Sequence, residues 1–297
     1  MKIAAILQYL RASGLAFRFS GEETAETDGF SSLGRYRPGT FTWLKSAKNI
    51  PDGMDMSAVR LAFVQQGEDC AAQNVIETAA SKRAFFSSIE HFYAAPETAA
   101  PVGQGTYLAE TVTCGEQVRL GHNCTLDGEI QIGAGTRIWN NVVLVGRVRI
   151  GENCEIKSGA VIGQDGYAYT ENAAQEKTMV RHFGGVSIGR DVLIGENVCI
   201  SRGTIDDTEI GDGCKIDALV HIAHNCRLGR GTAIAVPTSL SGSVTTGENC
   251  YIAGDIVRNQ IHLGQNAFIG LGAVVVKDVP DGVTVVGNPA KPFTKGK

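Results

Sequence analysis

The chain has 297 residues, 43% of them hydrophobic and 20% charged, with 27 lysines and arginines against 31 aspartates and glutamates. The resulting net charge of −4 argues against a nucleic-acid-binding protein, because no surplus of basic side chains exists to neutralise phosphates. No uncharged apolar run approaches the ~18 residues needed to span a bilayer, so we expect a cytoplasmic protein without a transmembrane segment.

The first 100 residues predict a small α/β domain. Residues 1–14 have the apolar spacing of an amphipathic helix and do not resemble a signal peptide. Residues 59–65 predict a strand and residues 81–93 a second helix. A linker is expected at residues 94–101, whose sequence is AAPETAAP.

From about residue 114 an aliphatic residue recurs at every sixth position, as at Leu120, Leu126 and Ile132. The pattern continues to Val275 with interruptions, and 21 of its 23 positions are Leu, Ile or Val. Neither a helix nor an ordinary strand has this period. A period of six is typical of a parallel β-helix, in which each hexad gives one short strand and one corner and three hexads close a coil. The count predicts seven to eight coils.

The chain contains 37 glycines but only 8 prolines, and many glycines directly follow the aliphatic residue of a hexad. We expect these glycines, and the asparagines of the GHN, GEN and GQN segments, at corners where φ is positive. β-Helices of the known hexad class wind left-handed, against the usual rule for crossovers. The predicted fold is therefore a mainly β left-handed parallel β-helix over residues 101–287, with a loop excursion at 163–187 and a tail at 288–297. Long loops on a rigid scaffold often carry function.

The cysteines and histidines could indicate a metal site, but their positions favour packing. Five of the eight cysteines occupy the fifth place of a hexad, which points inward, and the chain has no C-x-x-C. Unpaired thiols fit a reducing compartment. His221 and His224 have a spacing that could suit zinc, but no third histidine has a matching placement, so we expect no metal.

Three segments make the sequence more specific, and they lie at 163–170 (GQDGYAYT), 184–217 (with RGTIDDTEIGDG) and 216–225 (IDALVHIAHN). Together with the N-terminal domain they resemble the UDP-3-O-acylglucosamine N-acyltransferases of lipid A biosynthesis. The resemblance implies a homotrimeric β-helix enzyme that moves an acyl chain from a carrier protein to the amine of a nucleotide-linked sugar. It implies no permanently bound cofactor.

The resemblance assigns the general base to His224. An amine that attacks a thioester becomes acidic as the bond forms, and an imidazole titrates in the range suited to take that proton. Gly242 lies 18 residues further on, which is one full coil, and matches a glycine whose N–H helps to hold the oxyanion. Asp217 matches an aspartate that helps to place the acceptor amine, although a corner residue that caps a turn is an equal alternative.

The remaining predicted site residues bind substrate. Asp165, Gly166 and Tyr167 match the family's loop along the acceptor sugar, and His221 and Asn225 flank the general base. In the N-terminal domain Phe41 matches an aromatic residue that stacks on uracil, with core packing as the alternative. Leu44 stands where the family has a uracil-contacting asparagine, which leaves a thymidine-linked sugar possible.

The segment at 285–293, VVGNPAKPF, resembles the ending of CoA-dependent hexapeptide acetyltransferases, whereas the lipid A enzymes continue into a helical tail. We therefore expect transfer from acyl-CoA or acyl carrier protein to a nucleotide-linked amino sugar, without an acyl-enzyme. Three alternatives stay open: the lipid A N-acyltransferase itself, a sugar O-acetyltransferase, and a β-helical binding or assembly protein without activity.

Overall fold

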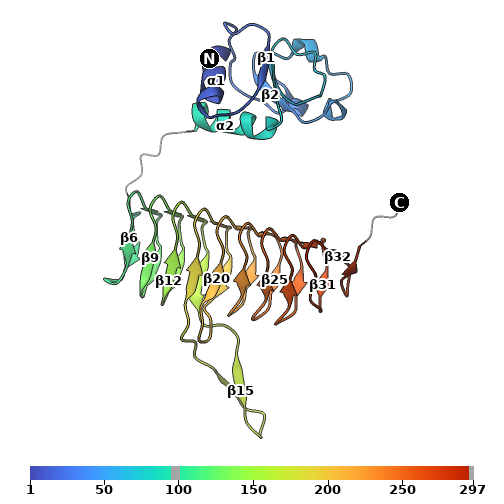
Figure 1. The fold of residues 1–297 in the computed structure, drawn as a ribbon. Coiled ribbons are helices and arrows are strands. Elements are labelled where there is room, and N and C mark those ends of the chain that lie inside the picture. The colour runs from blue at the N-terminus through green and yellow to red at the C-terminus, as the bar shows by residue number, and fades with distance from the viewer. Residues whose placement is uncertain (95–100, 294–297) are drawn as a thin grey trace. The chain divides into compact units, whose positions relative to one another are not determined.

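The structure is a computed structural model that describes residues 1–94 and 101–293. The chain divides into two compact units, Met1–Thr98 and Ala99–Lys297, and each is described by itself (Figure 1). Most of the predicted linker at 94–101 and the last four residues of the predicted tail lie outside the described residues.

The N-terminal unit is a four-stranded sheet in the order β1-β4-β3-β2, with two helices. Strands β2, β3 and β4 are parallel, and β1 is antiparallel to β4. The strands are β1 (Arg18–Ser20), β2 (Phe41–Leu44), β3 (Leu61–Gln65) and β4 (Val75–Thr78). The helices are α1 (Ile3–Ala12) and α2 (Ser81–Tyr93), and three short 3-10 turns lie at Leu33–Arg35, Ala47–Asn49 and Met56–Ala58.

Both predicted helices and the predicted strand of this unit are confirmed. The apolar face of α1, made by Ile3, Ile6, Leu7 and Leu10, is fully buried in a core that it shares with the sheet and α2. Within residues 1–94 and 101–293, no helix combines the length and the apolar character needed to cross a membrane.

The second unit is a parallel β-helix with three faces, along which Figure 1 shows the strands stacked in order. Face 1 contains β5 (Tyr107–Leu108), β8 (Thr125–Asp127), β11 (Val143–Val145), β14 (Val161–Gln164), β19 (Cys199–Ser201), β22 (His221–Ile222), β25 (Ser239–Leu240), β28 (Ile256–Val257) and β31 (Val274–Val275). Face 2 contains β6 (Thr113–Cys114), β9 (Ile130–Ile132), β12 (Val148–Ile150), β17 (Val186–Ile188), β20 (Thr208–Ile210), β23 (Arg227–Leu228), β26 (Thr245–Thr246) and β29 (His262–Leu263). Face 3 contains β7 (Arg119–Leu120), β10 (Arg137–Ile138), β13 (Glu155–Ile156), β18 (Leu193–Ile194), β21 (Lys215–Ile216), β24 (Ala233–Ala235), β27 (Tyr251–Ala253), β30 (Phe268–Ile269), β32 (Thr284–Val286) and the antiparallel β33 (Lys291–Pro292).

The fold class predicted from the six-residue period is confirmed, but the predicted coil number is too low. Nine parallel strands on faces 1 and 3 and eight on face 2 give nearly nine coils, not seven to eight. The count from the sequence began at Cys114 and ended at Val275. The β-helix already includes Leu108 in β5, and Val285 in β32 adds a further strand after a break in the period.

The predicted interior of the β-helix is confirmed by burial. The aliphatic residues of the hexads form one continuous core. The five cysteines in the fifth hexad place are buried within it: Cys124, Cys154, Cys214, Cys226 and Cys250. Thr246 occupies one aliphatic position and its hydroxyl accepts a hydrogen bond from the N–H of Gly229 at 2.9 Å, which satisfies the buried oxygen.

The corners follow the prediction for asparagine and differ from it for glycine. The asparagines of the predicted corner segments all have positive φ between 53° and 57°: Asn123, Asn153, Asn197, Asn249 and Asn266. Most glycines after the aliphatic residue do not have positive φ, and space explains them instead. At Gly121 a Cβ would lie 2.5 Å from the backbone of Trp139 in the next coil. These glycines allow neighbouring coils to approach closely.

The predicted excursion at 163–187 leaves the β-helix as a hairpin, visible as the projection below the coils in Figure 1. Its antiparallel strands are β15 (Tyr169–Glu171) and β16 (Lys177–Met179). A shorter insertion lies between β19 and β20, at 202–207. Both insertions border the candidate site.

Candidate active site

A pocket of about 680 Å³ lies on the C-terminal half of face 1 and the corner that leads from face 1 to face 2. Its walls come from the base of the hairpin, with Asp165, Gly166 and Tyr167, and from His224 and Gly242 on successive coils. Polar residues of these coils and of the coils on either side also line the pocket: Ser201, His221, Ser239, Ser241, Ser243, Asn259 and Gln260. The structure therefore brings together six of the nine residues that the sequence predicted for the site.

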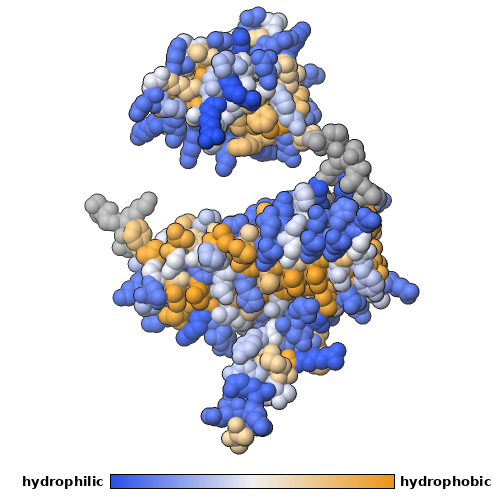
Figure 2. All heavy atoms as spheres, turned by 180° about the vertical axis from the view of Figure 1, so that it is seen from behind, coloured by the Kyte–Doolittle hydropathy of each residue, from blue (hydrophilic) through white to orange (hydrophobic). Residues whose placement is uncertain are grey.

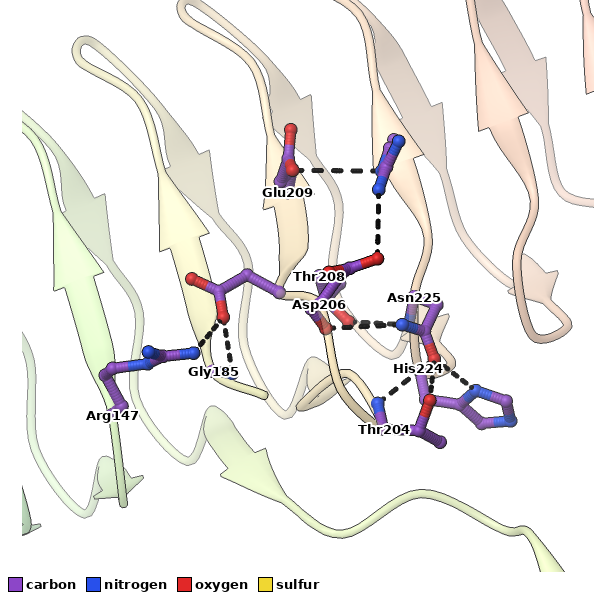
Figure 3. A network of polar contacts seen from close by, with 10 residues as sticks. Arg147, Gly185, Thr204, Asp206, Thr208, Glu209, His224 and Asn225 are labelled. Carbon is purple, nitrogen blue, oxygen red and sulfur yellow. Dashed lines mark hydrogen bonds and ion pairs between the residues drawn. The ribbon is translucent and has the colours of Figure 1, made fainter. Parts of the chain in front are cut away.

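The hydrogen bonds of Asn225 determine the tautomer of His224 (Figure 3). Asn225 Oδ1 accepts from the N–H of Thr204 at 3.1 Å and from its hydroxyl at 2.9 Å, and Asn225 Nδ2 donates to the Asp206 carbonyl at 3.2 Å. The amide oxygen thus faces His224 Nδ1, 3.0 Å away. Because this oxygen can only accept, Nδ1 carries the proton, and Nε2 of the neutral ring has a free lone pair. That is the form a general base requires.

The insertion after β19, whose sequence is RGTIDD, holds Asn225 in place. Asn225 has a φ of 59°, and its N–H donates to the Thr208 hydroxyl at 2.9 Å. Gly203 has no room for a side chain, because a Cβ there would overlap the carbonyl oxygen of Asp206. The segment therefore builds a rigid frame around one amide side chain.

Asp207 anchors the far end of this insertion. Its carboxylate accepts from the Arg147 guanidinium at 2.5 Å and from the N–H of Gly185 at 2.7 Å. These contacts tie the insertion to an earlier coil and to the end of the hairpin. The orientation of His224 thus depends on three segments that are distant in the sequence.

Gly242 packs directly against the His224 imidazole from the next coil. A Cβ at this position would lie 2.8 Å from both Nε2 and Cε1 of the ring, which is closer than real Cβ contacts. The backbone of Gly242 does not have positive φ, so space and not conformation requires glycine. Ser243 N–H donates to the His224 carbonyl at 2.9 Å and fixes the two corners. Among the described residues the Gly242 N–H has no hydrogen-bond acceptor, so it remains available to a ligand.

The hairpin base closes the other side of the imidazole. A Cβ at Gly166 would lie 2.9 Å from His224 Cδ2, so this glycine also allows close approach. Asp165 forms an ion pair with Arg202 at 3.4 Å, and the Arg202 guanidinium donates to the Gly163 carbonyl. Asp165 thus fastens the loop, in addition to lining the pocket.

His221 lies on β22 between Cys199 and Ser239 of the neighbouring strands. Partial burial lowers the pKa of His221 below its usual range, because desolvation disfavours the charged ring. His221 lines the pocket, and the serines of the neighbouring coils add hydroxyl groups to the same surface.

Three sequence predictions differ from what the structure contains. Asp217 lies outside the pocket, and its carboxylate accepts from the N–H groups of Ala218 at 2.9 Å and Val236 at 3.3 Å, so it caps a turn. Asn225 uses its amide within the protein and orients His224, so it is not free to bind substrate.

Phe41 is fully buried, with ring centroids of Phe63 and Phe85 at 5.6 and 5.7 Å. A nucleobase cannot stack on a ring that is enclosed in this way, so the prediction for Phe41 is corrected to core packing. Leu44 is also fully buried and belongs to the second hydrophobic cluster of this unit.

Sequence reasoning missed His182 and Arg202. His182 is only 2% exposed, and its ring centroid lies 5.4 Å from that of His224. Its position two residues before the Gly184–Gly185 pair, where the hairpin returns to the β-helix, was the available signal. In the part of the chain that the structure describes, no three His, Cys, Asp or Glu side chains gather in a way that could hold a metal ion.

The six-residue repeats of the β-helix are similar to those of a known protein family. Residues 129–164 and 207–236 match the family described as Bacterial transferase hexapeptide (six repeats).

The chain is 42% identical over 144 residues to a UDP-3-O-acylglucosamine N-acyltransferase of Caulobacter sp. (strain K31). The aligned segment covers 47% of this chain and 41% of the relative. A protein of the same name from Delftia acidovorans is 41% identical over 124 residues, covering 41% and 36%. The chain thus spans less than half the length of these relatives, and the predicted resemblance is confirmed over that part.

Among solved structures, LpxA from Acinetobacter baumannii superposes with a TM-score of 0.60 and 27% identity, covering 65% of this chain and 74% of the other. The UDP-N-acetylglucosamine O-acyltransferase of Moraxella catarrhalis gives a TM-score of 0.60 and 25% identity, with the same coverage. The β-helix is thus shared with acyltransferases that act on nucleotide sugars according to their names.

Proposed function

We propose that the protein is an acyltransferase that moves an acyl group from a thioester to the amine of a nucleotide-linked amino sugar. The observation that carries this proposal is the His224 imidazole, whose Nδ1 is held by Asn225 and whose Nε2 lies beside Gly242 in an open pocket. The similarity to proteins named UDP-3-O-acylglucosamine N-acyltransferase supports the acceptor class.

In the proposed reaction the acceptor nitrogen attacks the thioester carbon while His224 Nε2 takes a proton from that nitrogen. The carbonyl oxygen becomes an oxyanion and accepts a hydrogen bond from the Gly242 N–H. The tetrahedral intermediate then expels the thiolate, which receives the proton from the imidazolium. The products are an amide and a free thiol, and His224 returns to its starting tautomer because Nδ1 keeps its proton throughout. No acyl-enzyme and no permanent cofactor take part.

The acyl donor in this proposal is acyl-CoA or acyl carrier protein, which present the same thioester. The N-terminal unit is proposed to hold the nucleotide, although not through Phe41, which is buried. All eight cysteines are free, which fits the reducing conditions of the cytoplasm.

We also propose that the active form is a homotrimer. Large apolar side chains are exposed along the later coils, with Leu271 at 80%, Leu219 at 61% and Ile256 at 55% exposure. Figure 2 shows apolar side chains gathered on the surface of the β-helix. Apolar surface of this kind is typical of sites where proteins associate.

A second candidate is transfer to a sugar hydroxyl. The solved structures that resemble the β-helix include an O-acyltransferase, and the same imidazole can take a proton from a hydroxyl group. The two candidates differ only in the acceptor atom, so the identity of the product separates them.

The test is mass spectrometry of reactions that offer acetyl-CoA and 3-hydroxyacyl carrier protein to UDP- and dTDP-linked amino sugars and to their N-acetylated forms. The proposal predicts an amide product from the free amines, lost in His224→Ala and kept in His122→Ala, a corner histidine outside the pocket. An ester on the N-acetylated sugars would instead support the second candidate. No product with any pair would contradict both.

A further inference from the structure

The proposed reaction leaves one buried titratable group beside the site without a role. His182, in the connection from β16 to β17, is 2% exposed, and its ring meets that of His224 edge to face, with centroids 5.4 Å apart and planes at 85°. Gly166 lies beside both rings. A Cβ on Gly166 would lie 3.1 Å from His182 Nε2 and 2.9 Å from His224 Cδ2, so the two imidazoles border the same small space.

The tautomer of His182 follows from its own contact. Its Nδ1 lies 2.9 Å from the Val180 carbonyl oxygen, which can only accept, so Nδ1 carries a proton. In the neutral ring Nε2 therefore presents a lone pair on the side that faces Gly166 and His224. This atom is buried and has no hydrogen-bond partner among the described residues. An unpaired buried polar atom costs stability, and its retention calls for an explanation.

The surrounding segments hold His182 firmly in this position. The backbone N–H of His182 donates a long hydrogen bond to Asp165 Oδ2 at 3.4 Å, and Arg202 pairs with the same carboxylate at 3.4 Å. The backbone of His182 is thus held by Asp165, and its ring cannot turn Nε2 toward solvent without breaking the Nδ1 contact with the Val180 carbonyl.

We propose that His182 is a positioning residue for His224, which keeps the catalytic imidazole against Gly242 and favours its protonated form. When His224 accepts the amine proton, a positive charge develops beside the unpaired Nε2 of a neutral ring. This interaction is weak while His224 is neutral, so it stabilises the transition state more than the ground state. The assignment rests on the proposed role of His224 as the base.

Other titratable or charged groups near His224 also bear on its protonation, and the His182 variants leave them unchanged. Asp165, Tyr167 and His221 line the same pocket, Arg202 pairs with Asp165, and the Asp206 carbonyl accepts from Asn225. The corners of the next two coils contribute only uncharged residues to the pocket. Substitution of His182 alone therefore changes the electrostatics of the site without removing a charged neighbour.

The experiment compares His182→Phe with His182→Gln. Phenylalanine keeps the ring contact and removes the lone pair, whereas glutamine retains an acceptor. We expect His182→Phe to lower kcat about three- to tenfold with little change in KM, and to move the acid limb of the pH–rate profile down by about half a pH unit. His182→Gln should recover part of both effects. An unchanged pH profile in His182→Phe, or a rise in KM alone, would overturn the proposal.

A second readout does not depend on turnover. NMR titration of His224 in the wild-type protein and in His182→Gln and His182→Phe reports its protonation directly, with His91 and His122 as internal references. The proposal predicts a downward shift of the His224 midpoint in His182→Phe, smaller in His182→Gln, and no shift at the references. If the protein proves inactive toward every substrate, this titration still tests the coupling, so failure of the proposed function and failure of the coupling are distinguishable. Equal His224 midpoints in the wild type, His182→Gln and His182→Phe would contradict the proposed coupling between the two histidines.

Discussion

Gly242→Ala tests the packing of the active site most sharply. The added methyl group would lie 2.8 Å from His224 Nε2 and Cε1, whereas ordinary contacts begin at 3.4 Å, so the ring must move by about 0.6 Å. The Gly242 N–H is retained and φ is not positive, so neither the proposed oxyanion donor nor the backbone is disturbed directly. Displacement of a base by this distance lowers kcat by roughly 10- to 100-fold. The thermal midpoint should change little, because the imidazole borders an open pocket and can yield.

The assay is steady-state kinetics on the substrate pair identified by mass spectrometry, with thermal unfolding of the same samples. Gly34→Ala is the control, because nothing lies within 4 Å of a Cβ at that position and its φ is not positive. In a His224→Ala background Gly242→Ala should have no further effect on rate, since the contact is already gone. Full activity of Gly242→Ala in the presence of His224 would refute the proposed geometry.

Three further predictions follow from the contacts of the site and the core. Asn225→Ala should lower kcat by about 10²-fold, because His224 Nδ1 loses its acceptor, and should lower the thermal midpoint because the contacts with Thr204 and Asp206 are lost. Asn225→Asp keeps an acceptor for Nδ1 and should be less affected. Equal kinetics in the wild type and both variants would contradict the orienting role of Asn225. Burial lowers the pKa of His221, so the unfolded chain binds more protons than the native protein, and stability rises with pH up to about 6.5. His221→Gln should flatten this rise in thermal midpoints measured from about pH 5 to 7. An identical slope in the variant and the wild type would contradict this prediction. Burial raises the pKa of Cys226 to about 12 and that of Cys214 to about 11. Both thiols should therefore resist a thiol reagent at pH 8 that labels the exposed Cys114. Rapid labelling of Cys226 or Cys214 in the folded protein would contradict the structure.

The fold was predictable because a period of six residues is typical of a parallel β-helix. The hydrophobic core of the β-helix consists of aliphatic and small residues, and the corner asparagines have the expected positive φ. The period does not explain why a glycine is needed at a corner. At Gly121 the reason is the backbone of the next coil, a contact between residues 18 positions apart that becomes visible only in three dimensions.

The site was predictable partly from the period and partly from the resemblance. His224 and Gly242 lie one coil apart in phase, so their contact could be inferred from the sequence, whereas Asp165, Gly166 and Tyr167 lie in the excursion and were predicted from the resemblance alone. His182 lies in an excursion that has no period, and its distance from His224 depends on how Asp165 and Arg202 fasten the loop. Phe41 matched a motif, but its burial depends on how the core of the N-terminal unit packs around it.

The central claim is that the His224 imidazole removes the proton from the attacking acceptor, and chemical rescue tests it most directly. His224→Ala leaves a space between Gly166 and Gly242 that free imidazole can enter. The account predicts that this variant loses at least about 10²-fold in kcat and regains activity in proportion to the concentration of neutral imidazole. Activity of His224→Ala equal to that of the wild type, with no response to imidazole, would contradict the account.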